Sequence, residues 1–443
     1  MNKIITQAKK LVIPTKSLEK SKIQIANLAY GLVEEQIKDF SEVVGLEFGG
    51  SFAKGTWLSE SADVDIFIRF KETVPSDKFE EISKKIGFES MKKYHPYVRY
   101  SEHPYVEAKI KDTKVNVVPC YDVKLGKWKS SADRSPFHTR HMKKMLTAKM
   151  RDEVRLLKTF LQSTNIYGAE VAKQGFSGYV SEVLIINFGS FENVIKSISK
   201  IKENQVIGKA TKKFDTPIVI MDPIDTNRNL AAAISEENVG RLIMACRVFQ
   251  TNPSLKFFKK IKPKFSKTNQ ENILVVKFDF KMRSPDIIWG QTKRAANALS
   301  TQLSVGGFNV LKSTGFTDEK KESYLLFLLE SPIIPKKYAK IGPDFFREKD
   351  CRSFISKNQS KTELMWIDEN RKIVSLEKRK NSDAVKFVSD FLKNNLKTGV
   401  PKGLQNDFKR GYKVFLGTKN LSKSIKEVAN QLTSTDERIF YFN

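Results

Sequence analysis

Apolar and charged residues alternate in one short stretch of the chain, and this alternation decides its geometry. Asp63 and Asp65 stand on either side of Val64, and Ile66 and Ile68 continue the apolar positions. Successive side chains of a β-strand point to opposite faces. The stretch therefore predicts a strand with both carboxylates on one face and the apolar side chains on the other.

The first half of the chain alternates between helical and strand patterns. Residues 1–45 predict a helix packed ahead of the sheet, with an apolar stripe formed by Ile25, Leu28, Leu32, Val33 and Ile37. The patterns then predict a helix at residues 76–86 and strands at 106–110 and 115–119. A Lys-Asp-Thr turn joins these two strands and favours an antiparallel hairpin. Helical patterns follow near residues 152–158 and 180–188.

The second half begins a new arrangement after Pro253. The pattern predicts a β-α-β-β order, with a strand at 273–280, a helix at 289–303 and strands at 309–312 and 324–329. This order suggests a ferredoxin-like or RRM-like unit. A further segment starting at Gly342 predicts a hairpin, a helix and two short strands, at residues 363–367 with 372–376, 384–396, 412–416 and 439–442.

The two aspartates and the turn before them indicate a metal and phosphate site. Two carboxylates on one face repel each other, and Mg²⁺ compensates them while accepting phosphate oxygens as further ligands. A Gly49-Gly50-Ser51 turn precedes a segment that can start a helix, which offers backbone N–H groups and a hydroxyl to a triphosphate. The alternative for these residues is a β-hairpin with two solvated aspartates.

Composition favours a nucleic-acid partner. The 443 residues exceed one ordinary core, so we expect about two to four domains. The chain has 78 Lys and Arg against 50 Asp and Glu, which gives a net charge of +28 spread along the sequence. Such a charge suits a surface that binds along RNA or DNA. A lysine-rich composition can also be an adaptation for solubility. No apolar run approaches the roughly 20 residues of a membrane span, and no signal peptide opens the chain, so we expect a cytosolic, cytoplasmic protein.

The cysteines exclude two further classes of site. Cys120, Cys246 and Cys351 are odd in number and far apart, which fits neither a disulfide framework nor a zinc cluster. We therefore expect any metal to be held by oxygen ligands.

Several motifs together resemble a known family. Gly-Ser, a short spacer and Asp-x-Asp on a strand resemble the signature of the polymerase-β-like nucleotidyltransferase superfamily. The resemblance becomes close to the archaeal, class I CCA-adding enzymes, tRNA nucleotidyltransferases that rebuild the 3′ CCA end without a nucleic-acid template. It is carried by Pro136-Phe137-His138, the Arg-Leu-Leu-Lys run 155–158, Ile166–Glu170, Gly175–Tyr179 and Asp222–Asn229.

The resemblance implies a fold and a division of the chain. We expect an α+β multidomain protein with a polymerase-β-like nucleotidyltransferase catalytic head at 1–135 and a helical neck at 136–255 that recognises the nucleotide and its base. A ferredoxin-like or RRM-like body would comprise 256–335 and 400–443, and a small tRNA-binding tail 336–399. Basic and aromatic residues of the second half would track the tRNA acceptor stem, among them Phe257, Phe258, Lys259, Lys260 and Lys262.

The resemblance also implies roles for individual residues. Asp63 and Asp65 would be the catalytic, metal-binding carboxylates, with Mg²⁺ as cofactor and with CTP and ATP as substrates. Arg228 would read the base edge of the incoming nucleotide. The remaining nucleotide-binding positions are Ser51, Lys54, His138, Lys158 and Tyr167.

The chain departs from the family at one catalytic position. The family has a third carboxylate where this chain has Asn116, and an amide offers a metal only a neutral oxygen. Glu107, on the neighbouring predicted strand, is a possible substitute. Two alternatives therefore stay open beside CCA addition: another template-independent RNA nucleotidyltransferase, such as a poly(A) polymerase or an oligoadenylate synthetase, and a non-catalytic tRNA-binding protein. The sequence also leaves open whether the chain forms a homodimer.

Overall fold

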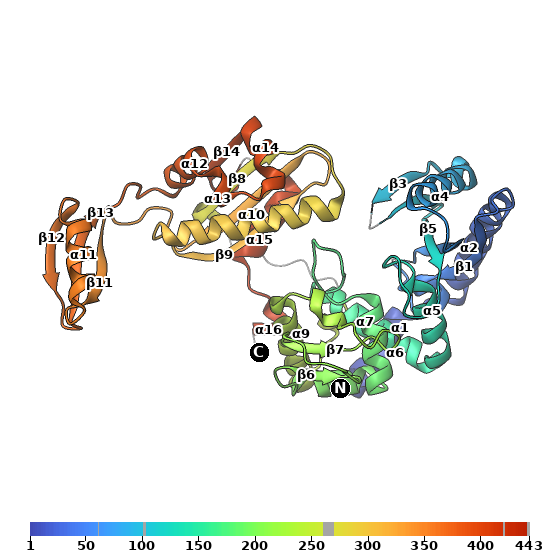
Figure 1. The fold of residues 1–443 in the computed structure, drawn as a ribbon. Helices are drawn as coiled ribbons and strands as arrows, with labels where there is room; N and C mark the ends of the chain where they lie inside the picture. Colours follow the sequence, from blue (N-terminus) through green and yellow to red (C-terminus); the bar gives the residue numbers. More distant parts are fainter. Residues whose placement is uncertain (61, 101–102, 260–269, 420, 441–443) are drawn as a thin grey trace. The chain divides into compact units, whose positions relative to one another are not determined.

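The computed structural model describes the whole chain except residues 61, 101–102, 260–269, 420 and 441–443. It is an α+β protein of two compact units, one comprising Met1–Lys262 with Asp436–Asn443 and the other Pro263–Thr435 (Figure 1). Of the residues expected to contact tRNA, Lys260 and Lys262 lie outside the described residues. The expectation is wrong for Phe257 and Phe258, which are buried in a hydrophobic core. None of the described helices is long and apolar enough to cross a bilayer.

A mixed β-sheet forms the centre of the head. Its five strands lie in the order β1-β2-β5-β4-β3, with β2 parallel to β5 and the other neighbours antiparallel. The predicted hairpin is confirmed as β4 and β5. The elements of the head are α2 (Lys16–Ile37), β1 (Val43–Gly49), α3 (Gly50–Lys54), β2 (Val64–Lys71), α4 (Ser76–Met91), η1 (Lys92–Tyr94), β3 (Tyr97–Tyr100), β4 (Pro104–Ile110) and β5 (Thr113–Asp122).

Helices α2 and α4 cover the same face of this sheet. Ile25 and Val33 of α2 and Phe79 of α4 share a core with Val64 and Val117 of the central strands. The predicted apolar stripe on α2 is wrong at Leu28, which is 48% exposed, because Ala26 and Ala29 contribute to the buried side of the helix in its place. Covering one face leaves the opposite face of β2, β5 and β4 for polar residues.

The region expected as the neck, 136–255, is a helical layer with its own core, to which α1 from the expected head also contributes. Its elements are α1 (Asn2–Val12), α5 (Arg134–Met145), α6 (Ala148–Ser163), α7 (Gly178–Phe188), α8 (Phe191–Ser199), β6 (Gln205–Ile207), β7 (Ile218–Ile220), η2 (Leu230–Ala233), α9 (Glu236–Thr251) and η3 (Leu255–Phe258). Rings from α6, α8, α9 and η3 contact one another at its centre, namely Phe160, Phe191, Phe249, Phe257 and Phe258.

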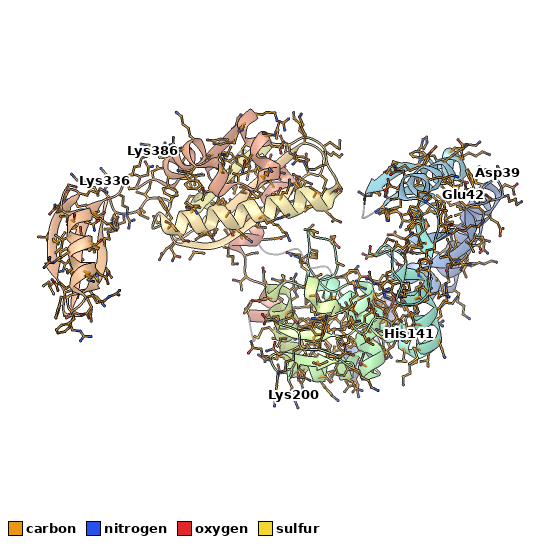
Figure 2. The ribbon with its side chains drawn as sticks, in the orientation of Figure 1. Asp39, Glu42, His141, Lys200, Lys336 and Lys386 are labelled. Atoms are coloured by element: carbon orange, nitrogen blue, oxygen red, sulfur yellow. The ribbon has the colours of Figure 1, made fainter. Side chains whose placement is uncertain are left out.

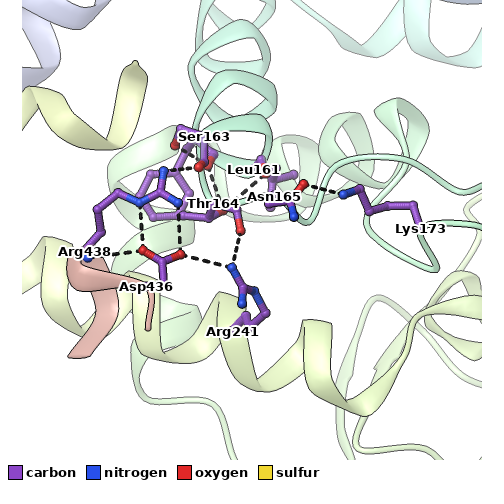
Figure 3. A network of polar contacts seen from close by, with 9 residues as sticks. Leu161, Ser163, Thr164, Asn165, Lys173, Arg241, Asp436 and Arg438 are labelled. Atoms are coloured by element: carbon purple, nitrogen blue, oxygen red, sulfur yellow. Dashed lines mark hydrogen bonds and ion pairs between the residues drawn. The ribbon is translucent and has the colours of Figure 1, made fainter. Parts of the chain in front are cut away.

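Both ends of the described chain pack into the neck core. Ile5 and Val12 of α1 and Ile439 of α16 (Glu437–Phe440) belong to it. The strand predicted at 439–442 is therefore wrong for its described residues, which are helical. Asp436 starts this helix and pairs locally with Arg438. The helix is fixed to the neck by the ion pair of Asp436 with Arg241 and by the bond that Arg438 donates to the Ser163 carbonyl (Figure 3).

The second unit contains an antiparallel sheet in the order β14-β8-β10-β9. Its elements confirm the predicted β-α-β-β order. They are η4 (Gln270–Asn272), β8 (Ile273–Asp279), α10 (Pro285–Val305), β9 (Val310–Thr317), β10 (Glu322–Leu329), α14 (Lys402–Arg410), β14 (Tyr412–Leu416) and α15 (Lys423–Thr433). One face of the sheet packs against α10 and α14, and the other against α15.

A smaller sheet follows β10 in the chain. It has the order β11-β13-β12 and carries one helix, with the elements β11 (Lys337–Asp344), α11 (Glu348–Asn358), β12 (Thr362–Ile367) and β13 (Lys372–Lys378). The predicted helix near 384–396 is present as α12 (Ala384–Asn394) and α13 (Leu396–Gly399). Ala384, Val388 and Leu392 of α12 lie in the core around α10, so this part of the expected tail packs with the body.

Candidate active site

Three polar side chains form a row across the uncovered face of the head sheet. Asp65 on β2 pairs in register with Asn116 on β5, and Asn116 pairs with Glu107 on β4. Their strand neighbours Val64 and Val117 are buried on the opposite face, as the alternation predicts. The row thus places the predicted metal ligand, the family's third-carboxylate position and its possible substitute side by side.

The glycine turn closes directly over Asp65. Gly50 has φ +61°, and a Cβ at this residue would lie 1.8 Å from the Asp65 Oδ2 atom. A side chain at Gly49 would likewise meet the Phe67 ring at 2.1 Å. Only residues without a Cβ allow the backbone to approach this closely, so the two glycines bring Ser51 and α3 next to the carboxylate.

Asp63 and Asp65 are carboxylates in a partly desolvated site. Burial is the main cause that raises the pKa of Asp65, while a hydrogen bond from Asn116 and the charge of Lys54 act in the other direction. Burial also raises the pKa of Asp63, and the charges of Asp65 and Glu107 add to the rise. A cation bound beside them would therefore stabilise the charged form of both carboxylates.

Asn116 offers such a partner one unused oxygen. Its Nδ2 donates to Asp65 Oδ1 at 2.8 Å, whereas its own Oδ1 is buried without a hydrogen-bond partner. Two aspartates and an amide oxygen are the hard donors that Mg²⁺ prefers, so these residues fit a divalent metal ion. Among the residues that the structure describes, no three His, Cys, Asp or Glu side chains gather closely enough to hold a metal.

Glu107 is occupied by other partners. It is 5% exposed and accepts hydrogen bonds from Tyr97 Oη and, at 3.4 Å, from Arg99 Nε. Both carboxylate oxygens are thus engaged on the side of β3. This arrangement favours a role for Glu107 in balancing local charge over a role as a direct metal ligand.

Two predicted nucleotide-binding lysines meet at a carboxylate that the sequence analysis missed. Lys54 Nζ lies 2.6 Å from Glu182 Oε2, and Thr56 Oγ1 donates to Glu182 Oε1 at 2.5 Å. Lys158 Nζ donates to the Thr56 carbonyl at 3.0 Å and lies 3.4 Å from Glu182 Oε1. One sequence signal was available, because Glu182 is a lone charge within the apolar helix α7.

Burial acts strongly on this cluster. It lowers the pKa of Lys158 to about 8, against the opposing charge of Glu182. Burial would raise the pKa of Glu182, but the charges of Lys54 and Lys158 outweigh it and the pKa is lowered. Tyr167 lies beside them, since a Cβ at Gly178 would approach both the Tyr167 hydroxyl and Lys158 Nζ. Burial raises the pKa of Tyr167, which keeps its hydroxyl protonated.

A second missed carboxylate, Asp222, holds the residues implied in base recognition. It accepts a hydrogen bond from Arg228 Nη1 at 3.1 Å, from Tyr179 Oη at 2.9 Å and from His138 Nε2 at 3.1 Å. Burial lowers the pKa of His138 despite the nearby Asp222, so the imidazole is neutral at pH 7 and its Nε2–H faces the carboxylate. His141, labelled in Figure 2, lies on the same helix α5 but outside this cluster of hydrogen bonds.

The two clusters are adjacent. Lys54 Nζ lies 5.6 Å from the centre of the Tyr179 ring, and this ring contacts the His138 ring in a tilted arrangement, with centroids 3.8 Å apart. Residues from the glycine turn, α5, α6, α7 and the 222–228 loop are therefore brought together. Of the predicted nucleotide-binding residues, Lys54, His138, Lys158, Tyr167 and Arg228 all belong to these clusters, and Ser51 lies in α3 beside them.

Comparison with known proteins finds related domains and relatives over most of the chain. Three family models match: a nucleotidyltransferase domain at 32–138, the second domain of tRNA nucleotidyltransferase at 152–259 and the CCA-adding enzyme C-terminal domain at 270–417. The CCA-adding enzyme of Sulfurisphaera tokodaii is 34% identical over 374 residues, which cover 82% of this chain and 88% of that protein. The chain belongs to the archaeal CCA-adding enzyme family. The CCA-adding enzyme of Methanothermobacter thermautotrophicus is 30% identical over 414 residues, or 90% of this chain and 89% of that one.

Two of the solved structures that match this chain are a poly(U) polymerase and a CdnC complex. The Cid1 poly(U) polymerase with Mg and 3′-dATP matches with a TM-score of 0.46 and 11% identity over 58% of this chain and 98% of that one. A CdnC complex from E. coli matches with a TM-score of 0.44 and 16% identity over 58% of this chain and 93% of that one.

Family membership confirms the resemblance inferred from the motifs. As a CCA-adding enzyme, the chain is a nucleotidyltransferase, and its α+β multidomain class is confirmed. The row of Asp65, Asn116 and Glu107 lies in the first matched domain, and Lys158, Glu182, Asp222 and Arg228 lie in the second.

Proposed function

We propose that this enzyme rebuilds the 3′ CCA end of tRNA without a nucleic-acid template, taking CMP from CTP and AMP from ATP and releasing pyrophosphate. This function serves tRNA maturation and repair. The observation that carries the proposal is the Asp65–Asn116 row beside the Gly50 turn, in a chain that CCA-adding enzyme models and relatives match from head to body.

Asp63 and Asp65 are the proposed catalytic residues and metal ligands. Nucleotidyltransferases of this fold generally use divalent ions, and for this chain we propose Mg²⁺, with the unpaired Asn116 Oδ1 as a neutral third donor. When bound, such ions activate the 3′-hydroxyl and stabilise the charge on the leaving pyrophosphate. Asn116 orients Asp65 by donating to its Oδ1, and Gly50 leaves room for its Oδ2.

The turn and the neck are proposed to bind the nucleotide. Ser51 and the N–H groups around it would meet the triphosphate, with positive charge supplied by Lys54 and Lys158. Tyr167 offers a protonated hydroxyl and an aromatic face. In the structure both lysines are bonded to Glu182. Their contact with phosphate is a proposal, and it requires the ammonium groups to interact with the triphosphate as well as with Glu182.

Arg228 is the proposed reader of the base. Its side chain is 41% exposed, while Asp222 accepts from one of its nitrogens and fixes its direction. The remaining guanidinium donors can bond acceptors that cytosine and adenine share. His138 supports the arrangement as a neutral donor to Asp222 Oδ2, the same oxygen that accepts from Arg228.

Charge is the proposed basis of tRNA binding. The net charge of +28 includes exposed lysines on both units, such as Lys200, Lys336 and Lys386 (Figure 2). RNA duplexes are recognised mainly by shape and phosphate contacts, so these residues need not read sequence. The head, neck, body and tail boundaries expected from the sequence, the cytoplasmic location and the oligomeric state remain predictions.

Substitution of the metal ligands tests the proposal. Asp63→Ala or Asp65→Ala should abolish nucleotide transfer and leave tRNA affinity nearly unchanged, because affinity rests on many phosphate contacts and transfer on the metal ligands. Asp39→Ala is a matched control, since Asp39 is an exposed head carboxylate after α2 (Figure 2). Turnover above about a tenth of wild type in either site variant would refute the assignment.

A further inference from the structure

Glu182 occupies an unusual position in the molecule. Glu182 and Thr56 are 0% exposed, Lys158 is 1% exposed and Lys54 is 7% exposed. Lys54 and Thr56 follow the glycine turn of the head, whereas Lys158 and Glu182 come from α6 and α7 of the neck. Burying charged side chains so completely is unfavourable unless each one is bonded to a partner.

The cluster contains more positive than negative charge. Two ammonium groups, those of Lys54 and Lys158, are bonded to one carboxylate, that of Glu182. Arg155, the next cation on α6, is already paired with Asp152 at 2.7 Å and donates to the Trp57 carbonyl. The two ammonium groups therefore share one buried carboxylate, and burial is the main cause that lowers the pKa of Lys158 to about 8.

These groups hold the segment after the turn to the neck, together with the bond from Arg155 to the Trp57 carbonyl. Glu182 accepts from Lys54 and Thr56, while Lys158 donates to both oxygens of Thr56, at 3.0 and 3.1 Å. The same Lys54 ammonium acts on Asp65, whose pKa it lowers against the larger effect of burial. Glu182 is thus connected through Lys54 to Asp65 and through Lys158 to α6.

We propose that Glu182 is a positioning residue of the nucleotide site. Its carboxylate holds Lys54, Thr56 and Lys158 together so that their excess positive charge attracts the polyphosphate of the incoming nucleoside triphosphate. This inference rests on the proposed function, because it takes the glycine turn as the triphosphate site. Glu182 does not itself contact substrate, since a carboxylate would repel phosphate.

Glu182→Gln tests the inference by CTP binding without transfer. Titration of CTP in the presence of Ca²⁺ should show affinity reduced about tenfold or more, because an uncompensated buried ammonium pair separates or loses a proton. Glu182→Asp, which keeps the charge, should recover part of the affinity. Glu153→Gln is the matched control: Glu153 is 4% exposed on α6 and bonds to Lys9 and the Phe191 N–H, away from the turn.

The pH dependence separates positioning from mere stability. Wild-type CTP affinity should fall as pH rises through about 8, where Lys158 loses its proton. Glu182 raises that pKa, so in Glu182→Gln the fall should begin about one pH unit lower or more, and Glu153→Gln should not move it. The other titratable groups around Glu182 and Lys158 are Lys54, Arg155, Tyr167 and Tyr179. Burial raises the pKa of both tyrosines, which keeps them neutral in this range.

Two outcomes would overturn the inference. One is a folded Glu182→Gln protein with unchanged or tighter CTP binding; the other is an unshifted pH profile. Should Glu182→Gln fail to fold, Thr56→Val is the second variant, because it replaces only the hydroxyl between Glu182 and Lys158. It should also weaken CTP binding. Unchanged CTP affinity in Thr56→Val would count against the proposal. If wild type transfers nucleotides and Asp65→Ala does not, the proposed function stands whatever the Glu182 and Thr56 variants show. The two proposals can therefore fail separately.

Discussion

Gly50 is the residue where the phosphate turn and the aspartate strand come closest. Its φ is +61°, and its missing Cβ leaves space that the Asp65 carboxylate fills. Any side chain at this position must displace either the turn or the carboxylate. The site therefore depends on a residue that performs no chemistry of its own.

Gly50→Ala should accordingly reduce nucleotide transfer by about a hundredfold or more, because the Cβ would lie 1.8 Å from Asp65 Oδ2. The matched control is Gly31→Ala in α2, where a Cβ meets nothing within 4 Å and helix propensity favours alanine by about 0.5–1 kcal/mol. Single-turnover rates with tRNA and CTP measure both. Near-normal transfer by folded Gly50→Ala would show that the turn can move away from Asp65.

Asn116 and Glu107 offer two accounts of the missing third carboxylate. If the site works with two aspartates and an amide, Asn116→Asp should keep or raise activity, because it restores an anionic ligand beside the metal. Glu107→Gln should then change turnover by less than about tenfold, in line with the engagement of Glu107 by Tyr97 and Arg99. If Glu107 supplies the missing charge instead, Glu107→Gln should cost roughly a hundredfold, about 2.7 kcal/mol.

A readout other than activity is available for Asn116→Asp. The new carboxylate would stand where Asn116 now donates to Asp65 at 2.8 Å, so the two acids would repel each other without metal. Added Mg²⁺ should therefore raise the melting temperature of the variant more than that of wild type. An equal response in both proteins would mean that residue 116 does not face the metal.

At the scale of elements, the alternation of apolar and polar residues was a reliable guide. It predicted β2 and the β4–β5 hairpin, which bury one face against α2 and α4. It also predicted the β8-α10-β9-β10 order, although β8 and β10 are buried on both faces. It failed at Leu28, where alanines form part of the buried side, and at 439–440, where Ile and Phe favour a strand by propensity. At the latter, Asp436 accepts from the backbone N–H of Arg438, and this local cap starts a helix.

The candidate site was predictable only in part for a related reason. Asp63, Asp65 and the turn lie close in sequence, so spacing alone brings them together. Glu182 and Asp222 bond to partners 128 and 84 residues away in the chain, Lys54 and His138 respectively. A local sequence pattern cannot predict contacts between residues so far apart in the chain. Only the fold shows that these carboxylates bond to the predicted residues.

The phenylalanine cluster of the neck gives a prediction about stability. Phe249 is 0% exposed and contacts four of the other rings. Phe249→Ala should lower the free energy of opening this unit by about 3–5 kcal/mol. Phe346→Ala, at a side chain 77% exposed, should change stability by less than about 0.5 kcal/mol. Hydrogen exchange of amides in α6 and α9 measures the first effect, and protection equal to wild type would contradict it.

At the scale of the whole molecule, charge should govern tRNA binding. With a net charge of +28, log affinity should fall linearly with log salt, with a slope that corresponds to on the order of 5–8 neutralised phosphates. Substituting a single exposed lysine of the second unit, such as Lys386, should weaken all tRNAs alike. Binding curves at several salt concentrations test this, and a salt-independent affinity would indicate a partner other than nucleic acid.

The central claim is that this chain adds C, C and A to tRNA without a template. The most direct measurement incubates a tRNA lacking its CCA end with the enzyme, Mg²⁺ and each nucleotide, followed by sequencing of the 3′ end. CTP alone should add two residues, CTP with ATP should complete CCA, GTP and UTP should add nothing, and Asp65→Ala should be inactive throughout. A run of A or U residues would indicate a different nucleotidyltransferase, and tRNA binding with no extension at any Mg²⁺ or Mn²⁺ concentration would contradict catalysis altogether.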